Sequence, residues 1–344
     1  MSAIGVIGAG AWGTALAQML ASDGREVVLW AREPAIVQTI RQTRANPLYL
    51  PGVTLHPTIR ATGAAGDLAG LDIVLLVTPA QAMGVVLDVM PDMAGDLVLC
   101  SKGIEAGTGR MMADVARAAR PRAEIAVLSG PTFAHEVAAG LPTAVTLACG
   151  GGEAQWRRLA PAIARPSFRP YYSHDLIGAE VGGAVKNVLA VACGVVEGLG
   201  LGQNARAALI SRGYAEMVRF GLAFGAEAET LTGLSGLGDL VLTCNSMSSR
   251  NFSLGKALGE GADAASLLAD RRTVAEGAFT APVLVELARA RAIAMPIADA
   301  VAALVSGAVP ARAVADALLA RPLRSELDCS ELDCLTMTGE PRLG

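Results

Sequence analysis

Short, almost continuously apolar runs alternate with amphipathic segments throughout the first half of the chain. These runs cover Ile4–Ile7, Val27–Trp30, Ile73–Val77, Leu97–Cys100, Ile125–Leu128 and Ala144–Leu147. Apolar strands separated by helices are typical of a largely parallel sheet that helices cover on both faces. The pattern therefore predicts an α/β domain with a mostly parallel sheet over residues 1–178.

The pattern changes after about residue 178, where alanine- and leucine-rich stretches take on helical spacing. Examples are Val283, Leu287, Ala290, Val301, Leu304 and Val305. Apolar residues three and four positions apart form one face of a helix, so we predict an all-α domain over residues 179–324. The three prolines of Pro161–Asp175 predict a connector, and residues 325–344 are expected to form a poorly ordered tail.

The composition is that of a globular protein, with 344 residues of which 52% are hydrophobic and 17% charged. A chain of this length fills about two domains and needs no disulfide framework. Its net charge of -4, without a basic block, argues against a nucleic-acid partner. No segment reaches the ~20 apolar residues of a membrane span, and Met1–Gly10 lacks a secretory signal, so we expect a cytoplasmic protein.

The histidines and cysteines do not suggest a metal site. His56, His135 and His174 are scattered along the chain, and Cys329 and Cys334 lack the usual spacing of zinc ligands. We therefore expect no bound metal.

A glycine motif, GAGAWG at residues 8–13, lies between the first predicted strand and the first predicted helix. In such a position Gly8 permits a tight turn, Gly10 lets a pyrophosphate approach the backbone, and Gly13 allows helix and strand to pack closely. The helix N-terminus at Ala11 offers its amides to phosphate. An ordinary glycine turn is the alternative, but the context favours a Rossmann-type dinucleotide site.

The end of the second predicted strand usually decides which dinucleotide binds. An acidic residue there accepts the ribose hydroxyls of NAD, whereas a cation accommodates the 2′-phosphate of NADP. Here Arg32 takes that position and Glu33 follows it. We therefore expect NADP(H) to be preferred and NAD(H) to remain usable, with an ordinary surface arginine as the alternative.

Polar loops follow the strands that end at Val77, Cys100 and Leu128, and in a parallel sheet these loops share one edge. They place Lys102, Gly130 and Thr132 around one pocket. Only three of the 28 basic residues are lysines. Because a lysine can give up its proton more readily than an arginine, Lys102 is a candidate for chemistry at this edge, although a plain turn would also explain the Gly130 segment.

A second lysine, Lys186, lies in an apolar helical stretch that contains Gly182 and Gly183. The glycines lie about one turn before the lysine and would leave room for a substrate or cofactor. Apolar neighbours would desolvate the ammonium group and lower its pKa toward that of a useful acid or base. The alternative is a packing helix whose lysine extends out to solvent.

Two further polar motifs follow in the helical half. Asp239 lies in the glycine-rich segment 234–240, where a simple turn is the alternative interpretation. Ser249, Arg250 and Asn251 precede a predicted helix, so they could bind a phosphate through backbone amides and the guanidinium group. Helix capping by a serine would explain the same residues.

Taken in order, GAGAWGT, SKGIE, SGPTFA, GAVKNV, LSGLGDLVLTC and SRN resemble the bacterial NAD(P)-dependent glycerol-3-phosphate dehydrogenases, from about residue 3 to 320. The resemblance implies reversible reduction of dihydroxyacetone phosphate to sn-glycerol 3-phosphate for phospholipid synthesis. It also implies a cytoplasmic and often dimeric enzyme, so we expect a homodimer.

The resemblance assigns roles to individual residues. It implies that Lys186 is the proton donor and acceptor, and we expect Asp239 to orient it. The implied substrate contacts are Lys102, Gly130, Thr132, Lys186, Asp239, Ser249, Arg250 and Asn251. The implied cofactor contacts, beyond Gly8, Gly10, Ala11 and Gly13, are Trp12, Arg32, Lys102, Ala134, Arg250, Val274 and Glu276.

Two other functions remain open at this point. A β-hydroxyacid or 6-phosphogluconate type dehydrogenase would share the domain order and the use of a lysine. Arg250 at a helix start favours a phosphorylated substrate, and the SKGI and GLGD segments are not typical of those relatives. A catalytically silent dinucleotide sensor would need the glycine motif but neither Lys186 nor Asp239.

Overall fold

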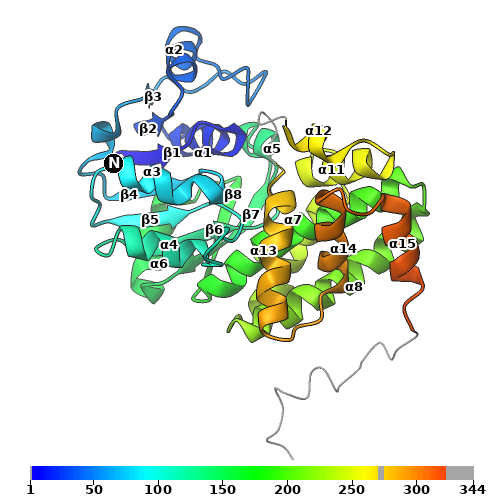
Figure 1. Ribbon diagram of the computed structural model, residues 1–344. Coiled ribbons are helices and arrows are strands. Elements are labelled where there is room, and N and C mark those ends of the chain that lie inside the picture. The colour runs from blue at the N-terminus through cyan, green and yellow to red at the C-terminus, as the bar shows by residue number, and fades with distance from the viewer. Residues whose placement is uncertain (1, 270–274, 323–344) are drawn as a thin grey trace, which may run out of the picture.

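The computed structural model describes residues 2–269 and 275–322. A sheet with helices on both faces forms the N-terminal part, and the remaining described elements are helices packed beside it (Figure 1). The predicted fold class is confirmed. Val274, Cys329, Cys334 and the predicted tail at 325–344 lie outside the described residues.

The sheet has eight strands in the order β3-β2-β1-β4-β5-β6-β7-β8. All neighbours pair in parallel except β6 and β7. The strands are β1 Ile4–Ile7, β2 Val27–Trp30, β3 Ile59–Thr62, β4 Ile73–Leu76, β5 Asp96–Leu99, β6 Glu124–Ser129, β7 Thr143–Cys149 and β8 Phe168–Ser173. Because β1 lies between β2 and β4, the chain changes direction across the sheet beside the glycine motif.

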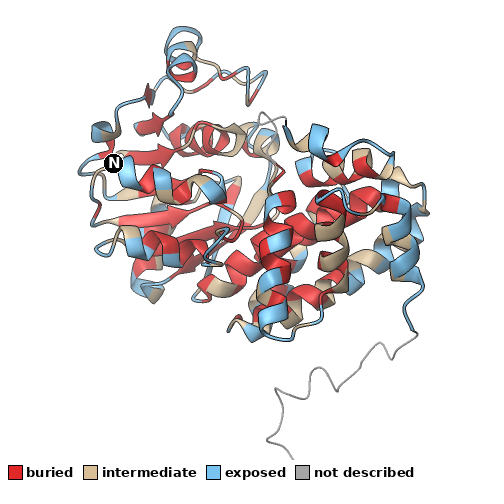
Figure 2. Cartoon of the chain, viewed as in Figure 1, coloured by how far each residue is buried: buried red, intermediate tan, exposed pale blue. Residues whose placement is uncertain are grey.

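Helices cover this sheet on its two faces, and Figure 2 shows buried residues concentrated along the strands between them. The α-helices of this part are α1 Ala11–Ala21, α2 Pro34–Thr43, α3 Met83–Val89, α4 Met112–Ala119, α5 Ala134–Ala138 and α6 Gly152–Ile163. Two short 3₁₀ helices, η1 Ala65–Leu68 and η2 Ala80–Ala82, complete it.

The predicted connector was wrong, because Pro161–Asp175 contains the end of α6 and the whole of β8. Pro161 lies in the last turn of α6, and Pro170 lies in an edge strand, where a missing N–H is tolerated. Strand β3, at the opposite edge, was not predicted from the sequence either. Neither edge strand shows the continuous apolar run that revealed the six inner strands, because β3 contains the exposed Arg60 and only Phe168 of β8 is fully buried.

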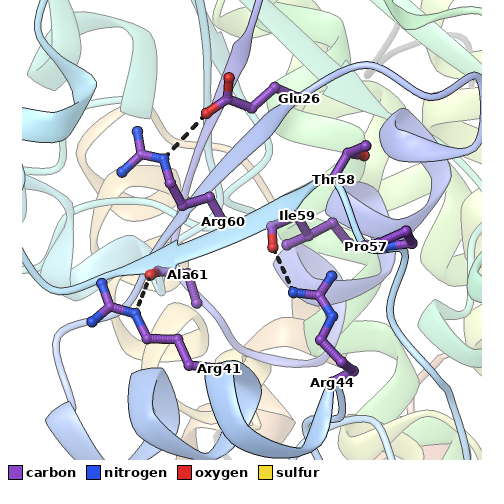
Figure 3. A pocket seen from close by; sticks show the side chains of 8 residues that line it. All are labelled: Glu26, Arg41, Arg44, Pro57, Thr58, Ile59, Arg60 and Ala61. Carbon is purple, nitrogen blue, oxygen red and sulfur yellow. Dashed lines mark hydrogen bonds and ion pairs between the residues drawn. The ribbon is translucent and has the colours of Figure 1, made fainter.

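Two arginines, Arg41 in α2 and Arg44 at its C-terminal end, lie along the edge of β3 that pairs with no other strand (Figure 3). Arg41 Nε donates to the carbonyl oxygen of Ala61 at 2.9 Å, and Arg44 Nη1 donates to that of Ile59 at 2.9 Å. They line an open pocket of about 510 Å³ together with Arg60. These contacts occupy carbonyl groups that could otherwise pair with a foreign strand.

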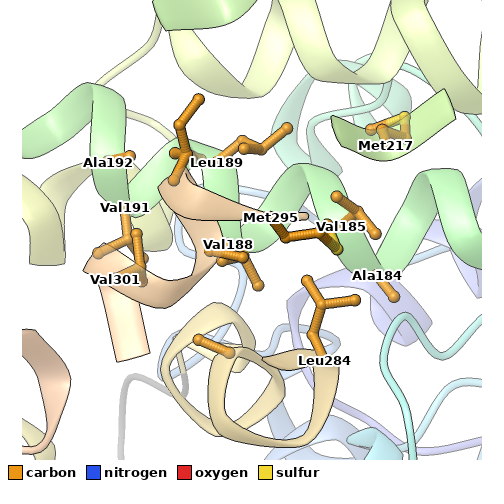
Figure 4. Close-up of a cluster of buried hydrophobic side chains, with 14 of the residues drawn as sticks. Ala184, Val185, Val188, Leu189, Val191, Ala192, Met217, Leu284, Met295 and Val301 are labelled. Atoms are coloured by element: carbon orange, nitrogen blue, oxygen red, sulfur yellow. The ribbon is translucent and has the colours of Figure 1, made fainter. Parts of the chain in front are cut away.

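The helical part begins with α7 Leu176–Gly198 and is built around it. The other elements are α8 Gly202–Ala223, α9 Ala228–Thr232, the π-helix η3 Leu234–Gly238, α10 Asp239–Cys244, α11 Arg250–Gly259, α12 Ala264–Ala269, α13 Glu276–Ala290, α14 Pro296–Val305 and α15 Ala311–Leu319. Valines and leucines of α7 pack with α8, α13 and α14 in one apolar cluster (Figure 4). A Cβ atom on Gly194 or Gly255 would clash with the backbone of the facing helix, so glycines let α7 and α11 pack closely.

The expectation about membrane spans needs a correction, because α7 is long and apolar enough to cross a membrane. However, 94% of its most apolar window is buried inside the protein. Its hydrophobicity is that of a central core helix, which has apolar neighbours on all sides.

The sheet and the helical part meet along α7. Leu176 and Ala179 pack with residues of the sheet, whereas Val181 and Ala184 belong to the cluster of the helical part. The helix therefore crosses the predicted boundary at residue 178, and the division at that residue stays a prediction.

Candidate functional site

The glycine motif forms the turn between β1 and α1. Gly8 has a φ of 111°, and a Cβ atom there would lie 2.7 Å from the carbonyl oxygen of Val77. A Cβ atom on Gly13 would clash with the carbonyl oxygen of Gly8, so its lack of a side chain lets helix and strand approach. A Cβ atom on Gly10 would meet nothing within 4 Å.

The start of α1 can hold an anion. Gly10 is its N-cap, and no side chain caps the first amides. Open space at Gly10 and uncapped amides at Ala11 and Trp12 match a pyrophosphate that approaches the backbone. Ala134 starts α5, which packs against α1, so it lies on the same side of the sheet. The residues therefore fit the predicted dinucleotide.

Arg32 follows β2, beside the glycine turn that follows β1. Its side chain is 76% exposed and pairs with Glu33, with 2.8 Å between Nη2 and Oε1. The guanidinium group is therefore accessible to a phosphate, and Glu33 competes with that phosphate for it.

The loops after β5 and β6 meet, as predicted. The Nζ atom of Lys102 donates to the carbonyl oxygen of Gly130 at 3.2 Å. Thr132 Oγ1 lies 3.4 Å from the same oxygen. Gly130 has a φ of 153°, and a Cβ atom there would lie 2.9 Å from Val145 Cα on the neighbouring strand. The peptide of Gly130 is thus held close to the sheet, with its carbonyl group directed at Lys102.

Two lysines from different parts of the chain bind one carboxylate. Asp239 is completely buried. Its Oδ1 accepts a hydrogen bond from Lys186 Nζ at 2.6 Å, and its Oδ2 accepts one from Lys102 Nζ at 2.6 Å. Lys186 Nζ also donates to Thr243 Oγ1 at 2.9 Å. We call Lys102, Lys186, Asp239 and Thr243 the lysine–aspartate cluster.

The electrostatics of this cluster favour proton transfer. Burial lowers the pKa of Lys186 to about 8; the Asp239 carboxylate opposes this shift, and the Lys102 ammonium reinforces it. The apolar residues of α7 and its neighbours supply the desolvation, as predicted. At neutral pH this amine is charged, yet its pKa lies closer to neutrality than that of an ordinary lysine.

The start of α11 contributes the remaining polar groups. Ser249 is its N-cap, and the hydroxyl accepts from the backbone N–H of Phe252 at 3.2 Å. Arg250 is exposed and forms no ion pair within the part of the chain that the structure describes. Asn251 is buried: Nδ2 donates to Asn187 Oδ1 at 2.9 Å, and Oδ1 accepts from Gly277 N at 2.9 Å.

Glu276 links α13 to the sheet. Its Oε1 accepts from the backbone N–H of Ala80 at 3.2 Å, just after β4. Burial raises the pKa of Glu276, and Arg250 is among the cations that oppose the shift. Arg250 and Glu276 are therefore close enough to sense each other's charge, at the junction of the sheet and the helical part.

Comparison with known proteins identifies the family. The N-terminal model of NAD-dependent glycerol-3-phosphate dehydrogenase matches residues 3–155, and the C-terminal model matches residues 175–316. The chain belongs to this family. It is an oxidoreductase that acts on a CH–OH group.

Similar proteins share nearly the whole length. A glycerol-3-phosphate dehydrogenase [NAD(P)+] of Novosphingobium aromaticivorans is 71% identical over 94% of this chain and 98% of its own length. One from Erythrobacter litoralis is 68% identical over 94% and 97% of the two chains. The crystal structure of glycerol-3-phosphate dehydrogenase from Coxiella burnetii has a TM-score of 0.88 and 38% identity, and the match covers 93% of this chain and 99% of that one.

The structure excludes the alternative interpretation of Asp239 as a turn residue, because η3 runs directly into α10 and Asp239 is the first residue of α10. One detail of the predicted site was wrong. Gly182 does not leave room for a ligand, since a Cβ atom there would clash with the carbonyl oxygen of Ser235. Gly183 faces the sheet instead, and its Cβ would lie 3.2 Å from Lys102 Cγ.

Thr243 and Asn187 were not predicted from the sequence as site residues. Each lies inside a motif that carried the resemblance, Thr243 in LSGLGDLVLTC and Asn187 in GAVKNV. Helical spacing was the available signal for Thr243, because it lies four residues after Asp239 and its hydroxyl donates to Asp239 Oδ1 at 3.2 Å.

Proposed function

We propose that this protein catalyses the reversible, NAD(P)H-dependent reduction of dihydroxyacetone phosphate to sn-glycerol 3-phosphate, the backbone supplied to glycerophospholipids. The observation that carries the proposal is the lysine–aspartate cluster. In this cluster Lys186, a desolvated amine of the helical part, and Lys102, from the edge of the sheet, bind the same carboxylate. The names of the relatives, at 71% and 68% identity, support the substrate.

The hydrogen bonds of the cluster leave N–H donors for a substrate oxygen. An ammonium group has three N–H donors. Lys186 uses two of them on Asp239 and Thr243, and Lys102 uses two on Asp239 and Gly130. One donor of each lysine therefore remains for the substrate.

The cofactor, when bound at the start of α1, supplies a hydride to the carbonyl carbon. Lys186 donates its proton to the oxygen on which negative charge develops, and its positive charge stabilises that oxygen before the proton moves. Asp239 keeps Lys186 directed at the substrate and keeps it charged at neutral pH. In the reverse reaction neutral Lys186 accepts the hydroxyl proton.

Arg250 is the proposed phosphate ligand. Its guanidinium is exposed at the first turn of α11, where the helix N-terminus also favours an anion. Ser249, Asn251 and Thr132 would complete the substrate pocket. Asn251 keeps one amide N–H beyond the one that it donates to Asn187. Its Oδ1 accepts from Gly277 N, next to Glu276. Glu276 is a proposed cofactor contact, together with Trp12, Ala134 and Val274.

We also propose that NADP(H) is preferred over NAD(H) through Arg32, that the protein acts in the cytoplasm, and that it forms a homodimer. The exposed guanidinium of Arg32 supports the first proposal. Sedimentation of the purified protein tests the third, and a mass of one chain would contradict it.

One assay tests the reaction. NADPH absorbance is followed after dihydroxyacetone phosphate, 6-phosphogluconate or a 3-hydroxyacid is added, in the matching reaction direction. Oxidation of NADPH that depends on dihydroxyacetone phosphate is expected. Turnover with only one of the other substrates would assign a different dehydrogenase, and cofactor binding without any turnover would indicate a sensor.

A further inference from the structure

Helix α7 carries a second buried ionisable side chain, Glu180, which the proposed reaction does not use. Its Oε1 atom accepts a hydrogen bond from the backbone N–H of Ala113 at 2.7 Å. Ala113 lies in the first turn of α4, in the N-terminal part of the chain. Glu180 therefore connects the helix that carries Lys186 to the part that carries the glycine motif.

The capping of α4 comes from outside its own sequence. Its N-cap residue is Met111, whose side chain cannot accept a hydrogen bond from the first amides. Helices normally satisfy these amides with a serine, threonine or aspartate at the N-cap. Glu180 takes that role from α7, 67 residues along the chain, so loss of its side chain leaves a buried N–H unpaired.

The segment before α4 contains Lys102. Ile104 pairs with Met111 through an isolated antiparallel bridge, so residues 104–111 form a closed loop that begins two residues after Lys102. Both residues pack in the same apolar cluster as Val181 and Ala184 of α7. The loop is thus attached to α7 through apolar contacts near its two ends.

Glu180 and Gly183 lie three residues apart, on one face of α7. A Cβ atom on Gly183 would lie 3.2 Å from Lys102 Cγ. The two ends of segment 102–113 therefore rest on neighbouring turns of the same helix, Lys102 at Gly183 and Ala113 at Glu180. Sliding or rotation of α7 past this segment would move Lys102 away from Lys186 and Asp239.

We propose that Glu180 is a positioning residue for the reaction: by binding Ala113 it sets α7 in register with segment 102–113, so that Lys102 and Lys186 meet at Asp239. The inference rests on the proposed function. Glu180 touches neither substrate nor cofactor and acts through the two lysines.

The contact between Glu180 and Ala113 requires the burial of a carboxyl group. Burial raises the pKa of Glu180 to about 8; the Ala113 amide and Arg117 oppose the shift, and the Asp114 charge adds to it. A carboxyl group without its ordinary hydration is unfavourable unless hydrogen bonds compensate. The partial positive charge at the start of α4 provides that compensation.

The experiment compares Glu180→Ala and Glu180→Gln with a matched control, Glu216→Ala. Glu216 is also buried and caps another helix, because it accepts from Ile297 N at 2.8 Å and Ala298 N at 3.2 Å at the start of α14. It is not part of the lysine–aspartate cluster. Both alanine variants lose a buried cap, but only one loses the contact with segment 102–113.

For Glu180→Ala we expect kcat with dihydroxyacetone phosphate to fall about ten- to a hundredfold, since a shift of about 1 Å has such effects. NADPH affinity should stay within about twofold, and the pH midpoint of kcat should move as Lys186 loses its neighbours. Glu180→Gln should restore most of kcat, because its amide oxygen accepts the same hydrogen bond. Glu216→Ala should lower the Tm but keep kcat and its pH midpoint.

The outcomes separate the two proposals. If the wild type does not turn over dihydroxyacetone phosphate, the proposed function fails. If the wild type is active and Glu180→Ala keeps both kcat and its pH midpoint, the positioning role of Glu180 is overturned. Should Glu180→Ala not fold, Glu180→Leu replaces it; this variant preserves side-chain volume, removes the acceptor and is expected to lose kcat to the same extent.

Discussion

The two halves of the candidate site are built in opposite ways. The dinucleotide turn is local: Gly8, Gly10 and Gly13 lie within six residues, and open space at Gly10 forms its essential feature. The lysine–aspartate cluster joins residues 53 and 137 positions apart, and its central carboxylate is fully buried. Substitutions in the dinucleotide turn should therefore act by blocking the approach of the cofactor. Substitutions in the lysine–aspartate cluster should act by changing the charge or the position of its side chains.

The largest effect is expected at Lys186. Lys186→Ala removes the proton donor, so kcat should fall about a thousandfold or more. NADPH affinity should change less than about twofold, because the dinucleotide turn is separate. Stopped-flow turnover and fluorescence titration of NADPH measure the two quantities, and near-normal turnover would remove Lys186 from the mechanism.

Asp239→Asn should have the next largest effect. It leaves two neighbouring ammonium groups without their carboxylate, and because Asp239 raises the pKa of Lys186, that pKa should fall. We expect kcat to drop about a hundredfold through lost alignment and its pH midpoint to move downward. An upward shift in the pH profile would contradict this electrostatic account.

Two glycine variants sharpen the comparison from the other side. Gly10→Ala adds a methyl group in open space, so the protein should fold normally while NADPH affinity drops about tenfold as the pyrophosphate is kept from the backbone. Gly13→Ala adds one against the Gly8 carbonyl group and should lower the Tm instead. Equal thermal stability of the two variants would show that Gly13 is not needed for the packing of α1 against β1.

The pH dependence follows from the lowered pKa of Lys186. Ketone reduction requires the protonated amine, so its kcat should be constant below pH 8 and fall above it, about tenfold per pH unit. Alcohol oxidation requires the neutral amine and should rise through the same range. Rate profiles in both directions test this, and parallel profiles would exclude Lys186 as the common group.

The smallest effect is expected at Arg32. Its exposed guanidinium is shared with Glu33, so Arg32→Ala should weaken NADPH binding only about two- to fivefold, as expected for a solvated ion pair. NADH binding should not change. A variant that loses affinity equally for both cofactors would show that Arg32 does not recognise the 2′-phosphate.

The sequence predicted the fold where the folding signal is local. Buried inner strands such as β1 and β2 were predicted at their observed residues, because both faces of a parallel sheet require apolar side chains. The edge strands β3 and β8 were missed, since only part of each is buried and Pro170 reads as a breaker. At the site the sequence indicated the reactive groups and predicted that Asp239 orients Lys186. It did not show that Asp239 also binds Lys102, or that Asn251 bonds to Asn187 and Gly277.

The order of glycine, lysine and acidic motifs already specified a dinucleotide site followed by a helical part with a reactive amine, because each motif requires only its own neighbours in the chain. The sequence without the structure could not reveal that Ser235 fills the space beside Gly182, or that Glu180 caps α4. Those contacts depend on how helices far apart in the chain pack, and burial then sets which charges approach closely enough to shift one another's pKa.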